Sequence, residues 1–96
     1  MNLTQPTALT LQALARGYRY GFDVMAATGL PSGTVYPLLR RLEREGCVVG
    51  RWEDEAAAFA EGRPRRRTYR ITARGRDVLA AALERFTYLR DALANP

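Results

Sequence analysis

Apolar side chains recur every three or four residues along much of the chain, the spacing that an amphipathic helix requires. The clearest example lies at residues 32–45, with Ser32 available as the N-cap and Gly46 as the stop. Its apolar positions fall at i, i+3, i+4 and i+7 and are Val35, Leu38, Leu39 and Leu42. Small and basic residues occupy the other side. This stretch therefore predicts a helix that is buried on one face and open on the opposite one.

Three further helices are predicted from the same spacing. The first is expected over Leu3–Arg16, with Thr4 or Gln5 at its cap. A short helix is expected between Tyr20-Gly21 and Gly29. A long last helix is expected from the cap Thr72 to about Ala94. The apolar face of the short helix is expected to consist of Phe22, Met25 and Ala26.

Two stretches have the alternation of strands. Residues 47–52 contain the β-branched cluster of the chain, and residues 67–72 place Tyr69 and Ile71 on one face. Residues 53–66 between them are expected to form a long loop, of the kind that is often functional or mobile. Trp52 and Tyr69 are expected in the core rather than in contact with nucleic-acid bases.

The order of these elements predicts a winged helix-turn-helix, mainly α with a small antiparallel β-hairpin, in the order α-α-α-β-β-α. Residues 1–73 are expected to form the winged domain, and residues 74–96 a C-terminal dimerisation helix packed on it. That helix would span roughly 30 Å at about 1.5 Å per residue. A 96-residue globule has a radius of gyration of only about 12–13 Å. The far end of the helix is therefore expected to overhang the domain and to bury Phe86, Leu89 and Leu93, the last part of its apolar stripe, against something else. The stripe consists of Leu79, Ala82, Leu83, Phe86, Leu89 and Leu93.

The charge distribution points to nucleic acid. The chain has fifteen basic residues, all arginine, against ten acidic ones, which gives a net charge of +5 and an isoelectric point near 10.1. Residues 63–76 alone hold seven arginines and no acid. Basic charge clustered in this way on a small domain is the electrostatic footprint of nucleic-acid binding.

Other chemistries are disfavoured by composition. The sequence contains no histidine, the commonest general base and metal ligand, and Cys47 is its single cysteine. No apolar run approaches the ~20 residues of a membrane span, and no signal peptide is visible. An enzyme is the least favoured class, no metal or other cofactor is expected, and the chain is expected to be cytoplasmic.

The helix at 32–45 carries the chemistry of a DNA-reading element. Ser32, Gly33 and Thr34 are small enough to allow close approach to a major groove, about 12 Å wide. Tyr36 offers a hydroxyl to a phosphate, and long arginines can reach a guanine edge or the backbone. These arginines are Arg40 and Arg41 in the helix and Arg63, Arg65, Arg66 and Arg67 in the loop.

The stretch YGFDVMAATGLPSGTVYPLLRRLEREGCVVGRWED, followed by GRPRRRTYRITARGRDVL, resembles the PadR family of bacterial winged-helix transcriptional regulators. The resemblance covers about Leu9 to Leu83 and is most specific at Gly33-Thr34-Val35-Tyr36-Pro37-Leu38-Leu39. The single C-terminal helix is similar to the short branch of the family. The loop at 53–66 is longer, and begins more acidic, than the family pattern leads one to expect.

The resemblance implies a DNA-binding repressor that acts as a homodimer through its first and last helices. Together with the residues above, the expected DNA-contacting set is Tyr20, Ser32, Gly33, Thr34, Tyr36, Pro37, Arg40, Arg41, Arg63, Arg65, Arg66 and Arg67. The expected dimer interface is Leu3, Leu11, Leu83, Phe86, Leu89, Arg90 and Leu93. A two-fold dimer implies a pseudo-palindromic operator. Effectors in the family are often small apolar or aromatic molecules, and no residue here identifies one.

Alternatives stay open at this point. The arginines of the helix are also compatible with a solvated surface, and the late apolar stripe with packing on the first helix of the same chain. A winged helix can serve as a protein-docking module with only non-specific affinity for nucleic acid. An RNA-binding role is disfavoured because no exposed aromatic platform interleaves the arginines.

Overall fold

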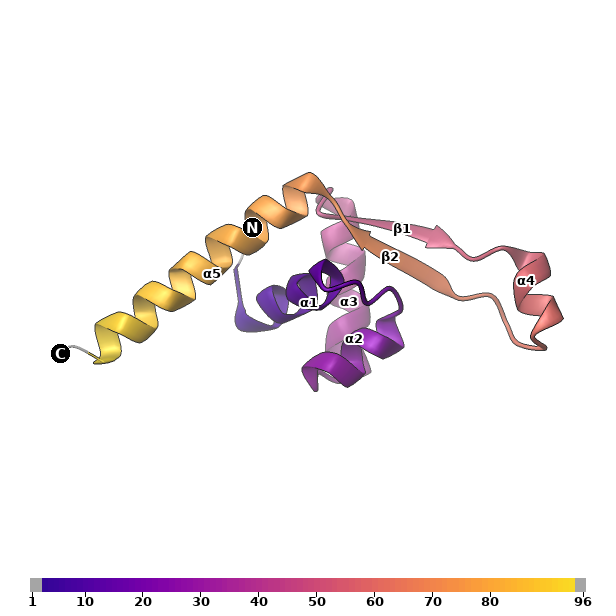
Figure 1. Ribbon diagram of the computed structural model, residues 1–96, viewed down its shortest axis with the longest axis horizontal. Helices are drawn as coiled ribbons and strands as arrows, with labels where there is room; N and C mark the ends of the chain where they lie inside the picture. The colour runs from indigo at the N-terminus through magenta and orange to yellow at the C-terminus, as the bar shows by residue number, and fades with distance from the viewer. Residues whose placement is uncertain (1–2, 95–96) are drawn as a thin grey trace.

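The computed structural model describes residues 3–94 as a three-helix body from which a β-hairpin and a long helix project on opposite sides (Figure 1). Its extents are 58 × 24 × 20 Å. In chain order the elements are α1 (Gln5–Ala15), α2 (Gly21–Thr28), α3 (Ser32–Arg44), β1 (Val48–Trp52), α4 (Glu55–Ala60), β2 (Arg67–Ile71) and α5 (Ala73–Ala94). The winged helix-turn-helix prediction is confirmed, with one added element, α4. Residues 1–2 and 95–96 of the two predicted domain ranges lie outside the described residues.

The core lies where α1, α2 and α3 meet the hairpin. All four residues of the predicted α3 stripe, Val35, Leu38, Leu39 and Leu42, are buried. Leu11 of α1 is also fully buried in this core. The expectation that Leu11 contacts a second chain is therefore corrected, because its side chain has no accessible surface to offer.

The helix ends follow local hydrogen bonding. Thr4 caps α1, its hydroxyl accepting from the Thr7 amide at 3.3 Å. Thr72 caps α5 in the same way, accepting from the Gly75 amide at 3.1 Å. The prediction of Ser32 as a cap is corrected to Pro31, because the Pro31 carbonyl already accepts from the amides of the first turn of α3. Ser32 is thereby the first helical residue.

The buried face of α2 differs from the prediction. Val24 is fully buried and Met25 packs against the core, whereas Phe22 is 72% exposed and Ala26 is also exposed. The helix is only eight residues long, so its apolar residues fit two neighbouring faces almost equally well by spacing. Packing selects the face that contains Gly21 and Val24.

The hairpin is antiparallel, with Val48 opposite Ile71 and Gly50 opposite Tyr69. Tyr69 and Ile71 share the inner face as predicted, and Tyr69 is buried. Trp52 does not lie in the core: it is 59% exposed, because β1 has left the helical body at that residue. The alanine-rich part of the predicted loop forms α4, which lies at the far end of the hairpin (Figure 1).

The start of α5 is joined tightly to the turn between α3 and β1. The Thr72 amide donates to the Cys47 carbonyl at 3.0 Å, and its hydroxyl donates to the Gly46 carbonyl at 2.7 Å. Gly75 lies against the same Cys47 carbonyl, where a Cβ would not fit. Strand β2 is therefore joined to α5 through Thr72, whose backbone and side chain are both hydrogen-bonded to the turn at Gly46 and Cys47.

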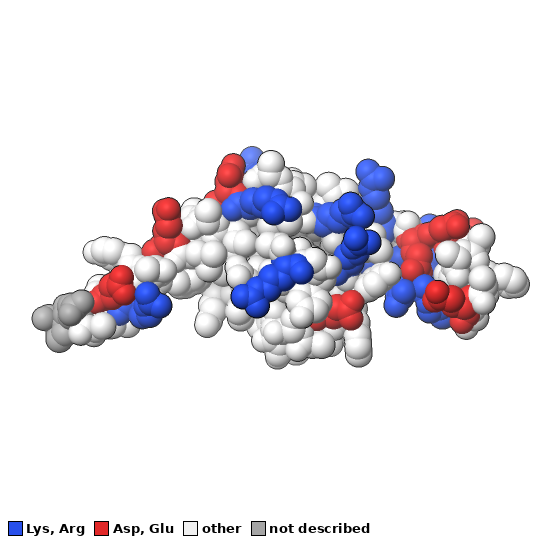
Figure 2. Space-filling model, in the orientation of Figure 1, with Lys and Arg blue, Asp and Glu red and all other residues white. Residues whose placement is uncertain are grey.

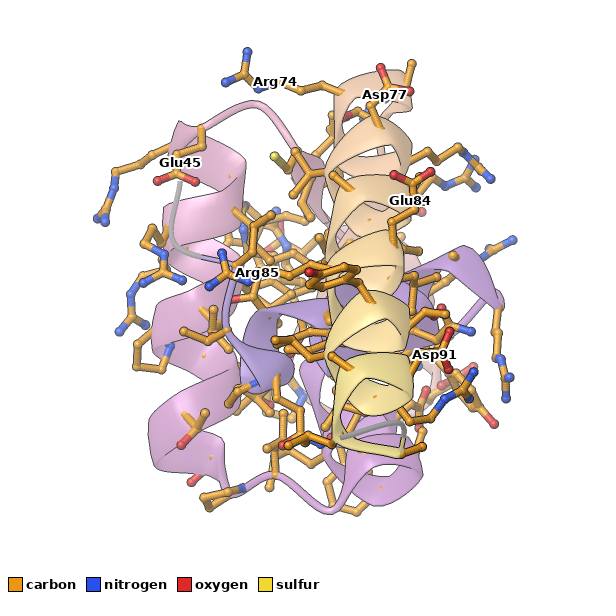
Figure 3. The ribbon with its side chains drawn as sticks, turned by 90° about the vertical axis from the view of Figure 1, so that its left-hand side faces the viewer. Glu45, Arg74, Asp77, Glu84, Arg85 and Asp91 are labelled. Atoms are coloured by element: carbon orange, nitrogen blue, oxygen red, sulfur yellow. The ribbon has the colours of Figure 1, made fainter. Side chains whose placement is uncertain are left out.

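The second half of α5 extends beyond the body, as predicted. Leu79 and Ala82 are buried against the core, but Leu83 and Leu89 are exposed and Leu93 is 83% exposed. Figure 3 views the helix from this end, with Arg85 pointing into the space between α5 and α3 and Asp77, Glu84 and Asp91 along the other side. The overhang thus presents unpartnered leucines to solvent.

Candidate nucleic-acid interface

The outer face of α3 is open to solvent over its first half. Ser32, Gly33, Pro37 and Arg40 are exposed, Tyr36 is 37% exposed, and Thr34 is half-buried. A Cβ built on Gly33 would meet no atom within 4 Å, so nothing in the described chain crowds this surface. Since the apolar stripe anchors the opposite face, the polar face of α3 is held in a fixed orientation.

The phenol of Tyr36 is positioned by close packing against α2. A Cβ on Gly21 would lie 2.8 Å from Tyr36 Cζ and 2.9 Å from its hydroxyl oxygen, so any larger residue there would displace the ring from its present position. Tyr36 and Gly21 line a cavity of about 150 Å³ together with Tyr20 and Phe22. The hydroxyl is thereby held at the edge of the α3 surface.

Arg41 is directed elsewhere. Its Nη2 donates to the hydroxyl of Thr7 in α1 at 3.2 Å, and its side chain is half-buried. It lies next to Leu42 at the border of the buried stripe, which turns it toward α1. Arg41 is therefore not brought together with Arg40, and the structure does not support it as a base-contacting residue.

At the base of the wing, arginines stack on aromatic rings. Arg66 lies over the ring of Tyr20 at 4.0 Å and donates to its hydroxyl at 3.2 Å. Arg65 and Arg67 both lie over Trp52, at 5.5 and 5.4 Å. Such cation–π contacts hold guanidinium groups in place without removing their charge. Tyr20, Arg66 and Arg67 line one cavity, and Arg65 lies with Arg67 against Trp52.

Glu53 is the hub of the wing. Arg63 donates to both of its carboxylate oxygens, with Nη2 to Oε2 at 2.9 Å, and Arg66 contributes its amide at 3.2 Å and its guanidinium at 3.3 Å. These contacts, led by the hydrogen bond from Arg63, lower the pKa of Glu53 from its ordinary 4.5 to about 2. Arg63 also binds Glu61 at 2.6 Å, and the two carboxylates raise its pKa. Arg63 is therefore a structural clamp rather than an available cation.

A second ion pair joins the wing to α3. Arg67 donates to Glu43 at 2.5 Å and to the Gly50 carbonyl at 3.3 Å. A Cβ on Gly50 would lie 2.8 Å from Arg67 Nε, so the glycine makes space for the pair. The basic segment is consequently less positive than its composition suggests. Among the arginines predicted to contact DNA, Arg40, Arg41 and Arg65 have no ion pair within residues 3–94.

The sequence reasoning missed Gly21, Glu43 and Glu53 as positioning residues. A signal for Glu53 exists in the strand register, because the pair Trp52–Arg67 places Glu53 opposite Arg66 at the next position. The Glu53 amide indeed donates to the Arg66 carbonyl at 2.8 Å. No comparable signal marks Gly21, whose role depends on how α2 crosses α3.

The proposed dimer residues divide into three groups. Leu83, Leu89 and Leu93 are exposed on the overhang, and Arg90 is exposed there beside Asp91, at 3.5 Å. Phe86 and Leu3 are half-buried. Leu11, as noted, belongs to the core.

The site is an exposed helix face beside a hairpin that carries arginines. Within residues 3–94, no group of three or more acidic, cysteine or histidine side chains could hold a metal ion. Over that range, no helix has the length and hydropathy needed to cross a membrane.

Comparisons with known proteins agree with this geometry. The family model described as the transcriptional regulator PadR-like family matches residues 10–81. No curated protein matches the chain. Among solved structures, a PadR family regulator from Clostridium difficile R20291 aligns with a TM-score of 0.81 at 20% identity, covering 95% of this chain and 96% of that one.

Two further structures extend the comparison. A PadR family regulator from Eggerthella lenta has a TM-score of 0.76 at 27% identity, covering 92% of this chain and 77% of that one. A structure concerning regulation of DNA binding of Bordetella bronchiseptica BpsR by 6-hydroxynicotinic acid has a TM-score of 0.72 at 19% identity, with 93% and 63% covered. The family match spans most of the chain, and its members are DNA-binding transcriptional regulators rather than enzymes. The chain belongs to the PadR-like family of transcriptional regulators.

Proposed function

We propose that the protein is a sequence-specific repressor that binds duplex DNA as a homodimer. The observation that carries the proposal is the outer face of α3, anchored from behind by four buried residues and uncrowded in front. The amides of Ser32 and Gly33 and the positive dipole end of α3 favour a phosphate. Arg40, which has no ion pair within residues 3–94, is the residue for a guanine edge in the major groove.

The base of the wing supplies the second contact. Arg65 and Arg66 are exposed and stacked on Trp52 and Tyr20, which presents their charge to a backbone or minor groove. Contacts of this kind position the protein without reading sequence. The two elements therefore have different roles in DNA binding. Helix α3 determines which sequence is bound, and the wing determines the affinity and its dependence on salt.

The overhang of α5 supports the homodimer. Leu79, Ala82, Phe86, Leu89 and Leu93 are separated by three, four, three and four residues, the repeat of a helix–helix seam. The first two are buried within the chain, whereas Leu89 and Leu93 have no cover in the described chain. A second copy that covers them would relate two α3 helices by a two-fold axis, which predicts a pseudo-palindromic operator.

Regulation by a small molecule is part of the proposal. BpsR, whose DNA binding is regulated by 6-hydroxynicotinic acid, shares the fold. We infer a small apolar or aromatic effector for this chain too. A cytoplasmic location in a bacterium belongs to the same proposal, because the DNA that such a regulator binds lies there.

Selection of bound sequences from random duplexes tests the proposal. The expected result is an enriched two-fold-symmetric motif whose binding persists from low to physiological salt. Arg40→Ala should remove enrichment at one position of each half-site, and Arg85→Ala on α5 is the matched control that leaves the motif intact. Binding without enrichment that collapses as salt rises would reject sequence-specific regulation and favour a protein-docking module.

A further inference from the structure

The tip of the wing is acidic and apolar, unlike its base. We define the wing tip as residues 54–62, which hold Asp54, Glu55 and Glu61 and no basic residue. Phe59 projects from α4 with 86% of its surface exposed. Asp54 and Glu55 have no ion pair in the described part of the chain. The negative charge of the wing tip repels phosphate. DNA binding by the base of the wing therefore does not explain why the tip is acidic and carries an exposed phenylalanine.

The tip is nevertheless held in shape. Arg63 closes the loop by bridging Glu53 at the end of β1 and Glu61 at the end of α4. The Arg63 amide donates to the Ala58 carbonyl at 3.2 Å, and Ala58 is the buried residue of α4. Phe59 therefore lies on a six-residue helix that these contacts hold in place, and its exposure does not result from an unstructured loop.

A basic depression lies on the body of the molecule. It has a volume of about 300 Å³ and lies between the end of α1, β2 and the start of α5. Arg19, Arg70 and Arg76 line it from three separate segments, and Leu14 and Ile71 are among its apolar lining residues. No acidic residue lines it, and the three arginines have no ion pair within residues 3–94. We call it the arginine pocket.

The arginine pocket is a separate hollow from the cavity beside Tyr36, and Tyr69 is the one lining residue that the two share. In Figure 1, α3 lies behind α1, and Figure 2 shows basic side chains over α1, the hairpin and the start of α5 on the facing side, with acidic ones around α4. The pocket also lies at the opposite end of α5 from Leu89 and Leu93. None of its lining residues belongs to α3 or to the overhang of α5.

We propose that the wing tip of one molecule docks into the arginine pocket of a second copy, with Phe59 on the apolar floor and Asp54 and Glu55 against the arginines. The charges and the apolar groups of the two surfaces are complementary. Because α4 lies at the far end of the hairpin from the pocket, the contact joins different molecules. This inference rests on the proposed function for its biological setting: the contact would link repressor dimers along DNA.

The geometry of the contact determines its consequences. Tip and pocket are different surfaces, so the contact is heterologous and adds copies in a row instead of closing a pair. One aromatic knob with a few ion pairs is smaller than a stable interface of about 1,200–2,000 Å². The contact is therefore weak in free solution, and neighbouring sites on one DNA raise its effective concentration.

Sedimentation of the full-length protein without DNA tests the contact independently of operator recognition. At low salt the average mass should rise with concentration beyond that of a single dimer, and high salt should reverse the rise. Phe59→Ala should weaken this association by about tenfold, as expected for loss of an aromatic anchor. Tyr88→Ala, which removes an exposed aromatic ring of α5, is its matched control and should leave the association unchanged.

Complementation makes the test directional. Glu55→Arg and Arg76→Glu should each abolish association alone, and an equal mixture should regain it, because each variant retains the surface that the other lacks. Glu84→Arg on α5 is the charge control. A constant mass at all concentrations, or a mixture that stays apart, overturns the proposal. Arg76-dependent binding of benzoate, the probe for a small aromatic acid, without self-association would also overturn it and assign the pocket to a small ligand.

Discussion

Gly21 and Tyr36 are packed so closely that the α2 backbone at Gly21 forms one wall of the site of the Tyr36 ring. The glycine is buried at the start of α2, and the tyrosine is on the exposed face of α3. The two helices of the helix-turn-helix are therefore held together at the residue that we expect to contact phosphate. Their relative position and the aim of the phenol are determined by the same contact.

Gly21→Ala should destabilise the protein by about 1–3 kcal/mol, the usual cost of inserting a methyl group into a filled space. It should also weaken DNA binding, because the phenol is displaced. Thermal unfolding and binding assays measure the two effects. In a Tyr36→Ala background the same substitution should cost nothing in stability, since the ring is gone. An equal cost in both backgrounds would contradict the packing argument.

The wing should lose its order in acid. The pKa of Glu53 is lowered to about 2, mainly by the hydrogen bond from Arg63, so its ionised form stabilises the folded wing. That stabilisation is complete above the ordinary pKa of 4.5 and is lost as pH falls toward about 2. The protection factors of the amides at residues 54–63, which compare the observed exchange rate with the intrinsic rate at the same pH, should fall over this interval.

Glu53→Gln provides the control for that titration. It should give low protection factors in the wing already at neutral pH, with no further change in them between pH 4.5 and about 2. Exchange at the buried helices should be the same in both proteins at neutral pH. A wing that stays protected at pH 2 in the native protein would show that the carboxylate pairing does not hold it.

The arginines of the wing should differ in what they contribute to DNA affinity. Arg65→Ala should weaken binding to all sequences alike and reduce the slope of log affinity against log salt by about one unit. This reduction of the slope is expected because Arg65 has no carboxylate partner in the described structure and is available to a phosphate. Titrations at several salt concentrations measure it. Arg41→Ala, which removes a residue bound to Thr7, is the matched control and should leave the slope unchanged.

The overhang of α5 should control assembly. Leu89→Asp places a charge on the exposed seam and should weaken the homodimer by at least 2 kcal/mol, about thirtyfold, with a parallel loss of DNA affinity. Tyr88→Asp puts the same charge on the neighbouring residue, outside the seam, and should leave the dimer intact. Light scattering distinguishes the two. A Leu89→Asp protein that stays dimeric would place the interface elsewhere.

Helix periodicity predicted the buried face correctly where the apolar residues of a helix fit only one face. In α3 the four apolar residues define a single face, and all four are buried. In α2 two faces were nearly equivalent, and only the crossing with α3 decides that Phe22 is exposed. Trp52 shows the same limit, because its size suggests a core residue but β1 has already left the body there.

For the candidate site, composition located the basic segment but not its pairing. Whether an arginine is available depends on carboxylates from other elements: Glu43 lies on α3, and Glu53 follows β1. Arg63 and Arg65 are two residues apart and have the same formal charge, yet one is clamped and the other has no ion pair within residues 3–94. The strand register alone predicts that Glu53 lies opposite Arg66. It does not predict that Gly50 makes space for the Arg67 side chain.

The hydrogen bonds at Thr72 fix the start of α5 rigidly to the rest of the domain. The bonds of Thr72 to Gly46 and Cys47 join the helix to the end of α3 and to the hairpin at once. In the proposed dimer, a tilt of α5 would therefore swing both DNA-contacting elements of a protomer as one rigid head. The distance and the rotation between the two DNA-contacting units would then depend on the length of α5, because each helical residue adds about 1.5 Å and 100°. The length of α5 then acts as a ruler for the spacing of operator half-sites.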